Sequence, residues 1–532
     1  MTSTLIRGAR VIDGSGAAWF NADVRIEGGR IAAVAPDLQT DGAALVEADG
    51  LYLAPGFIDA HCHDDLICLR ERTRPEKALQ GVSTVVVGNC SFSLYPGIGA
   101  AAEPLRQHFS GLLGETAPDE IFADFAAYRT ALQSPGVALN LVSLVGHAAL
   151  RLAVLGHDRR AADAAERVRM QAILARQLEQ GAAGLSLGLV YPPSAYADEA
   201  ELLALAETVR AHGKLLAAHI RNYESGLLAA MEEFIGLLRR SGAAGLLSHL
   251  QCAGRPNWGT IPKALALLEA ARGEGIDIGF DMYPYPAGSS YMLQLLPPAA
   301  QEGGLDALLA RLRDPVGRAA LRHVVEEGDP DPHAPQSKVA LIGWGSILIS
   351  GTGDAALKPY EGRTMEDAAQ ALGMAPFDLM ARFIEADAGQ TAIVMFQLDE
   401  GDLHAACTHR LHMFCSDGLP RPGTRPHPRA YGAFPRAVGT LTRDKHWFAL
   451  EDAVRRMTSA AAHRFRLFDR GLIRPGFAAD LTLFSPDIAD RATFADPVRI
   501  AHGIVGLWVN GARVVADGGV TGALPGRVLG QS

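Results

Sequence analysis

The sequence predicts an α/β protein built on a (β/α)8 barrel, with a small β domain assembled from both ends of the chain. Eight apolar runs in the middle of the chain have the length of buried strands, and helix-length amphipathic stretches separate most of them. Short alternating strands with glycine-rich turns occupy both termini. A chain of 532 residues is also long enough for one large domain with additional parts.

The terminal strands are expected to form one β domain of residues 1–54 and 471–532. Near the N-terminus, apolar and polar residues alternate in short runs that end at glycines. The C-terminal region has the same pattern, and Asn510 and Gly511 stand between two apolar runs. Asn-Gly in that position is a strong signal for a β-hairpin.

The barrel is expected within residues 55–470. Its predicted strands are 56–59, 84–87, 138–145, 184–190, 215–220, 245–250, 276–283 and 411–416. Amphipathic helices are predicted between several of them, at 161–180, 198–212, 225–241 and 262–273. The seventh and eighth strands are separated by far more residues than one helix needs, so we expect an insertion after strand seven, at 287–346.

The composition excludes several classes of protein. Apolar residues make up 48% and charged residues 20% of the chain, as in globular proteins. The 59 acidic residues exceed the 49 lysines and arginines, and the net charge of -10 argues against a nucleic-acid partner. No run approaches the roughly 20 apolar residues that span a membrane, and no secretory signal is recognised. Six cysteines are too few for a disulfide scaffold, so we expect a cytoplasmic protein. The sequence leaves its oligomeric state open.

Polar residues with metal-binding chemistry follow five of the predicted strands. His61 and His63 follow the first strand and, two residues apart on an extended chain, point to the same side. The others are Cys90, His219, His249 and Asp417, after strands two, five, six and eight. Active-site residues of barrels cluster at these strand ends, and imidazole, thiolate and carboxylate are zinc ligands. Each residue alone has a structural explanation, but their joint placement favours a metal site.

Longer motifs surround these residues and point to a known family. They are residues 54–63 (APGFIDAHCH), 88–90 (GNC), 188–193 (GLVYPP), 219–221 (HIR), 252–259 (CAGRPNWG), 281–285 (DMYPY), 416–420 (SDGLP) and 427–436 (HPRAYGAFPR). With these motifs the chain resembles the metal-dependent amidohydrolase superfamily and, more closely, the N-acyl-D-amino-acid deacylases (D-aminoacylases). The resemblance covers nearly the whole chain.

The resemblance implies a fold and a set of metal ligands. The fold is a (β/α)8 barrel with a β-sandwich built from both termini and a mobile insertion after strand seven. The implied ligands of one tightly bound zinc are Cys90, His219 and His249, while His61 and His63 contribute a weaker second metal position or a pocket wall. Many binuclear amidohydrolases carry a carboxylated lysine at the end of strand four, and residues 185–191 contain no lysine.

The expected activity is zinc-dependent hydrolysis of the amide of an N-acyl-D-amino acid, which releases a carboxylate and a free D-amino acid. Zinc activates the attacking water, and Asp417 takes its proton and passes it to the departing nitrogen. The alternatives are a cyclic amidase of the hydantoinase or dihydroorotase type, another amidohydrolase acting on a different amide, and a non-catalytic zinc scaffold. A scaffold would close its zinc site with four protein ligands and would not need Asp417.

The small-molecule substrate carries an α-carboxylate that needs polar partners. Arg429 is the first candidate, because a guanidinium binds a carboxylate through two hydrogen bonds. Tyr283 and Ser289 are further candidates, and Tyr191 is expected to contact the tetrahedral intermediate. Gln251 stands where family members often carry a lysine, which leaves the anchoring of the carboxylate open. The start of the insertion, residues 287–296, is apolar and lacks arginine, which favours substrates with neutral side chains.

Overall fold

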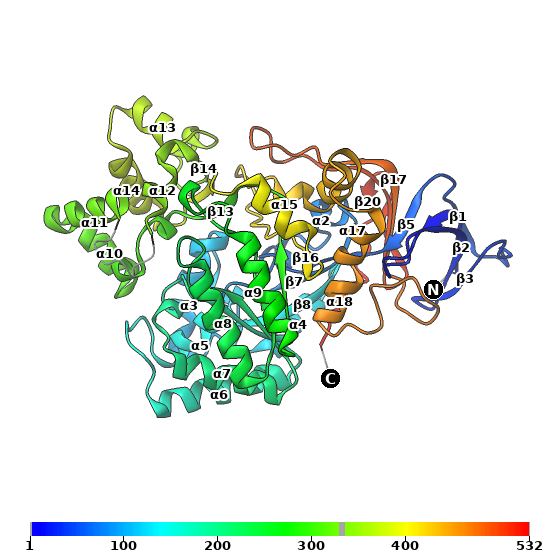
Figure 1. Ribbon diagram of the computed structural model, residues 1–532, viewed down its shortest axis with the longest axis horizontal. Coiled ribbons are helices and arrows are strands. Elements are labelled where there is room, and N and C mark those ends of the chain that lie inside the picture. The colour runs from blue at the N-terminus through cyan, green and yellow to red at the C-terminus, as the bar shows by residue number, and fades with distance from the viewer. Residues whose placement is uncertain (1–2, 329–335, 531–532) are drawn as a thin grey trace.

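The computed structural model describes residues 3–328 and 336–530, which contain three β-sheets. A sheet of eight parallel strands occupies the middle of the molecule, between a nine-stranded sheet at one end and a unit with a three-stranded sheet at the other (Figure 1). None of the helices in these described ranges has the length and apolar character needed to cross a membrane.

The central sheet is a nearly closed parallel barrel, and it contains all eight predicted strands. They are β6 (Phe57–Asp59), β7 (Val82–Val87), β8 (Asn140–Gly146), β9 (Gly184–Gly188), β10 (Leu215–His219), β11 (Ala244–Leu247), β12 (Ile278–Met282) and β16 (His412–Phe414). Each strand pairs with its neighbour in this order. Every residue of β7 and β8 is buried, because side chains fill the barrel and helices cover its outside.

Backbone hydrogen bonds join the segments that directly follow β6 and β16, the two end strands of this sheet. The amide of Asp417 donates to the carbonyl of His61 at 2.8 Å, and the amide of His63 donates to the carbonyl of Gly418 at 3.1 Å. The closing seam of the barrel therefore runs through the segments that carry the predicted site residues.

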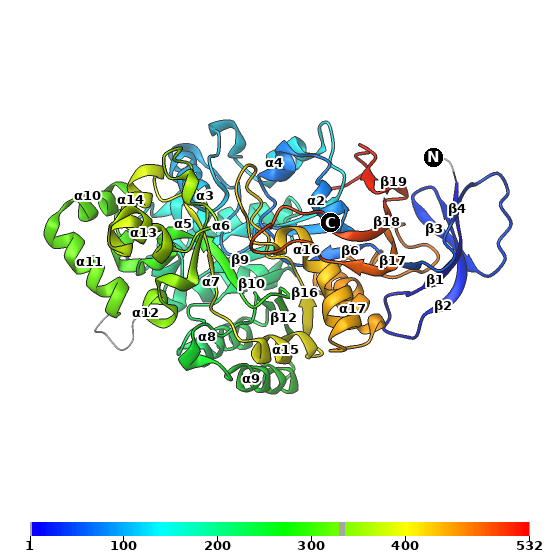
Figure 2. The ribbon, with the colours of Figure 1, turned by 90° about the horizontal axis from the view of Figure 1, so that it is seen from above.

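Helices surround the barrel, among them the four predicted between its strands (Figure 2). The helix α6 begins with a capping box in which Asp163 and Glu166 bond each other's backbone amides, and α8 ends at Gly242 in the left-handed conformation. The helices outside the insertion are α1 (Ile67–Arg70), α2 (Pro75–Ala78), α3 (Ala102–Leu113), α4 (Phe125–Gln133), α5 (His147–Val154), α6 (Ala164–Glu179), α7 (Glu199–Ala211), α8 (Leu227–Ser241), α9 (Ile261–Gly273), α15 (Glu400–Thr408), α16 (Arg429–Arg436), α17 (Leu450–Met457) and α18 (Ser459–Arg464).

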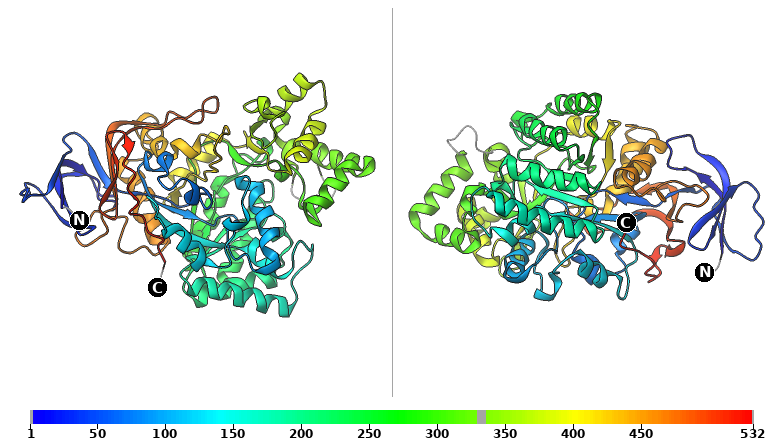
Figure 3. Two further views of the ribbon diagram at one scale, coloured as in Figure 1. Left: turned by 180° about the vertical axis from the view of Figure 1, so that it is seen from behind. Right: turned by 90° about the horizontal axis from the view of Figure 1, so that it is seen from below.

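The nine-stranded sheet contains strands from both ends of the chain, which lie at the same end of the molecule (Figure 3). The N-terminal strands are β1 (Thr4–Val11), β2 (Phe20–Glu27), β3 (Arg30–Ala35), β4 (Ala44–Glu47) and β5 (Tyr52–Pro55). The C-terminal strands are β17 (Leu481–Ala489), β18 (His502–Val509), β19 (Ala512–Ala516) and β20 (Gly519–Val520). The termini join where β5 pairs with β17. The predicted hairpin connects β18 to β19, and Asn510 and Gly511 have the positive φ that its turn requires.

The segment after β12 forms a separate unit with its own hydrophobic cluster, which extends from Met292 to Met395. Its elements are β13 (Gly288–Tyr291), α10 (Gly304–Arg313), α11 (Pro315–Glu327), α12 (Lys338–Ile342), β14 (Ile347–Gly351), α13 (Met365–Leu372), α14 (Pro376–Asp387) and β15 (Ala392–Met395). The unit continues past residue 346, the predicted end of the insertion, because β15 is the central strand between β13 and β14.

Candidate active site

The six side chains predicted as metal ligands or as proton carrier all lie near the carboxyl ends of barrel strands. His219 ends β10, and the others lie in the segments that follow β6, β7, β11 and β16. All are buried, with at most 7% of their surface exposed: His61, His63, Cys90, His219, His249 and Asp417.

Three of these side chains form a cluster with the chemistry of a zinc site. The sulfur of Cys90 and one ring nitrogen each of His219 and His249 lie within 4.8 Å of one another. The distance between Cys90 Sγ and His249 Nε2 is 3.5 Å. One sulfur and two imidazole nitrogens fit zinc, and three protein ligands is the number typical of a catalytic zinc ion.

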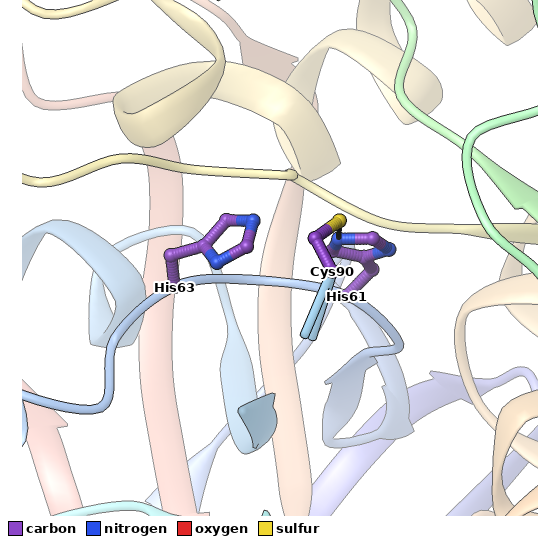
Figure 4. Close-up of side chains that lie close together, drawn as sticks. All are labelled: His61, His63 and Cys90. Atoms are coloured by element: carbon purple, nitrogen blue, oxygen red, sulfur yellow. Dashed lines mark hydrogen bonds between the residues drawn. The ribbon is translucent and has the colours of Figure 1, made fainter. Parts of the chain in front are cut away.

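A second cluster shares the same sulfur. His61, His63 and Cys90 also offer ligand atoms within 4.8 Å of one another, and His61 Nε2 lies 3.3 Å from Cys90 Sγ (Figure 4). Cys90 therefore lies between two possible metal positions, one with His219 and His249 and one with His61 and His63.

The backbone is strained at three residues of the site. Cys90, His249 and Asp417 have φ values of 52°, 35° and 44°, in the left-handed region that residues with a side chain rarely adopt. Each such residue costs about 1–3 kcal/mol, and such strain concentrates at functional sites. The turns after β7, β11 and β16 thus hold these three side chains in place at an energetic cost.

The charges of the site favour an ionised thiol and an ionised carboxyl. Burial raises the pKa of the Cys90 thiol, but the surrounding imidazoles lower it well below its ordinary value. Burial also raises the pKa of Asp417, yet Arg429 and the neighbouring histidines lower it well below its usual range. Asp417 lies 2.9 Å from the guanidinium of Arg429 and 3.3 Å from His63 Nε2.

Asp281, which the sequence analysis did not assign to the site, holds two of the histidines. Its Oδ1 accepts a hydrogen bond from the backbone amide of His249 at 2.8 Å, and its Oδ2 lies 3.4 Å from His61 Nδ1. A proton on Nδ1 leaves Nε2 of His61 free to face Cys90. The sequence did contain a signal for this role. Asp281 lies inside the apolar run of β12, and a buried carboxylate requires a polar partner.

The residues predicted to bind substrate line one small cavity of about 40 Å³ together with Cys90 and Asp417. The hydroxyl of Tyr283 donates to Gln251 Oε1 at 2.7 Å, and the guanidinium carbon of Arg429 lies 4.3 Å from the centre of the Tyr283 ring. Nε and Nη1 of Arg429 are buried and have no hydrogen-bond partner in the described structure. Arg429 thus retains donors that can bind an anion.

The other two predicted substrate residues also border this cavity. Ser289 donates its hydroxyl proton to the carbonyl of Ile393 at 3.0 Å, which leaves the oxygen only as an acceptor towards a substrate. The ring of Tyr191 packs 4.9 Å from the ring of His219, and its hydroxyl is 3.4 Å from Gln294 Nε2.

Lys338 is a cation of the pocket that the sequence analysis missed. Its place in the insertion, far from the barrel strands in the chain, gave no local signal. Lys338 lines the cavity and lies 2.5 Å from Glu224 Oε1, in the loop after β10. Besides the apolar start of the insertion, the pocket wall therefore also contains a charged residue of the insertion.

Comparisons with known proteins agree with this architecture. Residues 44–515 match the model of the Amidohydrolase family. The D-aminoacylase of Alcaligenes xylosoxydans xylosoxydans is 35% identical over 99% of this chain and 97% of its own, and the N-acyl-D-aspartate deacylase of the same organism is 35% identical over 99% and 94%. The solved structure of N-acyl-D-glutamate deacylase from Bordetella bronchiseptica, complexed with zinc and a phosphonate inhibitor that mimics the tetrahedral intermediate, superimposes with a TM-score of 0.82 at 34% identity over both whole chains. The predicted resemblance is thus confirmed: the chain belongs to the amidohydrolase family and, within it, to the N-acyl-D-amino-acid deacylases.

Proposed function

We propose that this protein is a zinc-dependent hydrolase that cleaves the amide bond of N-acyl-D-amino acids into a carboxylate and a free D-amino acid. The observation that carries this proposal is the convergence of Cys90, His219 and His249 next to the carboxylate of Asp417. A D-aminoacylase and deacylases of N-acyl-D-glutamate and N-acyl-D-aspartate are similar over nearly their whole length.

In this proposal Cys90, His219 and His249 hold one zinc ion tightly. A second, weaker position uses Cys90 with His61 and His63. When bound there, zinc would act as a Lewis acid that activates water and polarises the scissile carbonyl. The buried and strained arrangement of the ligands supports a preorganised site, because the donor atoms are already close together.

Asp417 is proposed to move the proton. Its low pKa keeps the carboxylate ionised, as a general base requires before the reaction. It accepts the proton of the attacking water and delivers it to the nitrogen of the leaving D-amino acid, which otherwise departs as a poor leaving group. Its place between His63, which follows β6, and Arg429 supports this role, because both the metal cluster and the substrate pocket border it.

Arg429 is proposed to bind the substrate α-carboxylate with its unpaired Nε and Nη1 donors. Tyr283 and Gln251 form one hydrogen-bonded wall of the same cavity and can contribute further polar contacts. Ser289 and Tyr191 complete the lining. We propose substrates with neutral side chains, because Lys338, the cation that the insertion adds to the pocket wall, is paired with Glu224.

The decisive experiment combines metal analysis with a substrate panel. The protein should contain zinc and hydrolyse N-acetyl-D-amino acids in preference to their L-enantiomers. The variant Asp417→Asn should keep its zinc content and lose about 100-fold or more in kcat, as removal of a proton carrier does. A preference for the L series would contradict the stereochemistry, and activity on ring amides alone would favour a cyclic amidase.

We also propose that the protein is located in the cytoplasm. All six cysteines are unpaired and buried, which supports a reducing compartment such as the cytoplasm.

A further inference from the structure

The cavity at the metal cluster opens into a larger chamber of about 430 Å³ between the barrel and the insertion. The chamber is walled by residues 294–299 of the insertion and by the loops after β9 and β10. Five residues line both cavities and so form the neck between them: Val190, Tyr191, Glu224, Gln294 and Lys338. A substrate group too large for the inner cavity must pass this neck.

Two of the neck residues carry opposite charges. Nζ of Lys338, the first residue of α12, lies 2.5 Å from Oε1 of Glu224. Their side chains are only 16% and 5% exposed, so water screens the pair weakly. Gln336, two residues before Lys338, connects this part of the insertion to the loops after β10 and β11. Its Oε1 accepts hydrogen bonds from the amide of Ser225 and from the side chain of Asn257. The neck is therefore charged at two points but neutral as a whole.

The outer chamber offers no spare cation among its described lining residues. Its three arginines are paired with glutamates: Arg159 with Glu302, Arg160 with Glu166, and Arg221 with Glu233. An anionic group that reached the neck would leave much of its water behind and find Lys338 already paired with Glu224. A neutral group would meet instead the apolar surfaces of Val190, Leu295 and Leu296 and their neighbours.

We propose that Glu224 and Lys338 determine the charge that the substrate can carry at its outer end. By neutralising Lys338, Glu224 restricts the enzyme to N-acyl-D-amino acids whose outward group is uncharged. This inference rests on the proposed function and deepens it, because relatives acting on acidic and on other N-acyl-D-amino acids are about equally similar to this chain. The outward group is either the amino-acid side chain or the acyl chain, and the experiment distinguishes the two.

The test uses substrate pairs that differ in charge and hardly in size. N-acetyl-D-glutamate and N-acetyl-D-glutamine report on the side chain, whereas N-succinyl-D-leucine and its terminal amide report on the acyl chain. For each pair the ratio of kcat/KM, acid over amide, is measured in the purified zinc-loaded full-length protein. Because both substrates of a pair are assayed on one preparation, a partial loss of folded enzyme cancels in the ratio.

The variant Glu224→Gln should raise this ratio about tenfold or more in one of the two pairs, since an unpaired lysine then faces the anionic group. The pair that responds identifies the end of the substrate at the neck. Lys338→Gln should lower the same ratio, because Glu224 then repels the anion. The double variant should return the ratio to within about threefold of the wild type, since the neck is neutral again.

Ratios that stay within about threefold of the wild type in both pairs would overturn the inference, as would single variants that shift the ratio in the same direction. The activity of the wild type on N-acetyl-D-glutamine distinguishes a failure of this inference from a failure of the proposed function. If the wild type cleaves this amide and the ratios do not respond, only the role of Glu224 and Lys338 is wrong. If the wild type cleaves no N-acyl-D-amino acid, the proposed function itself is wrong.

Discussion

Lys77 on α2 is expected to hold the barrel closed where β6 meets β16. Its ammonium donates to Asp59 Oδ2 at 2.5 Å and to Ser416 Oγ at 2.6 Å, and its side chain is only 1% exposed. Asp59 Oδ1 accepts the backbone amide of Ser416 at 2.8 Å. Asp59 and Ser416 precede His61 and Asp417, so this buried network positions residues from both strands of the closing seam.

The substitution Lys77→Met removes the charge and retains most of the side-chain volume, so the loss of apolar packing is small. Breaking a buried ion pair from one side costs about 3–5 kcal/mol, because the remaining charge stays buried without a partner. Asp59 keeps hydrogen bonds from the amide and hydroxyl of Ser416, which places the expected cost near the lower limit, about 3 kcal/mol. We expect a lower melting temperature and a lower kcat.

The assay is thermal unfolding at neutral pH together with kcat, KM and zinc content. A matched control is Lys445→Met, which removes a lysine from an exposed ion pair with Glu400 and should cost less than about 1 kcal/mol. The double variant Lys77→Met with Asp59→Asn should recover part of the stability, because it removes the unpaired charge and keeps an acceptor for the amide of Ser416. A Lys77→Met variant as stable as the surface control, or a double variant less stable than Lys77→Met alone, would refute a role of Lys77 in closing the barrel.

Cys90→Ser should lower the zinc content measured by mass spectrometry, since a serine hydroxyl is a far weaker zinc ligand than a thiolate; one full equivalent of zinc in the variant would contradict the proposed ligand set. Arg429→Lys should raise KM for N-acyl-D-amino acids about tenfold or more, because a lysine cannot bind a carboxylate through two parallel hydrogen bonds, and an unchanged KM would remove Arg429 from substrate binding. Burial lowers the pKa of His412 to about 3, so between pH 6.5 and pH 3 the unfolded chain binds a proton that the folded protein does not, and stability falls as the pH falls. At pH 5 this loss amounts to about 2 kcal/mol, and His412→Leu should therefore show a smaller drop in melting temperature from pH 7 to pH 5 than the wild type, whereas an equal drop would contradict the buried neutral histidine.

Much of the fold was predictable because its signals are local. Buried parallel strands consist mostly of apolar residues, as in β7 and β8, so eight strands were recognisable without any knowledge of their partners. The barrel then implies that residues after different strands meet at one face, which predicted the neighbourhood of Cys90, His219 and His249. The hairpin at Asn510 depended on turn chemistry alone.

The length of the insertion was less predictable. Its strands β14 and β15 lie far from β13 in the chain, and the amphipathic helices between them resemble barrel helices in pattern. Only the pairing of β15 with both other strands shows that the unit extends to Met395. The hydrophobic pattern of a short segment does not show which distant strand completes its sheet.

The sequence by itself determined the barrel strands, four of the helices between them and the side chains that stand at the strand ends, since these follow from periodicity over a few residues. The tertiary structure decided which charges meet. Lys77 contacts Ser416 across 339 positions, and Lys338 contacts Glu224 across 114. Such pairs form because a buried charge must find a partner, and which partner is within reach depends on how the closed barrel and the insertion bring distant loops together.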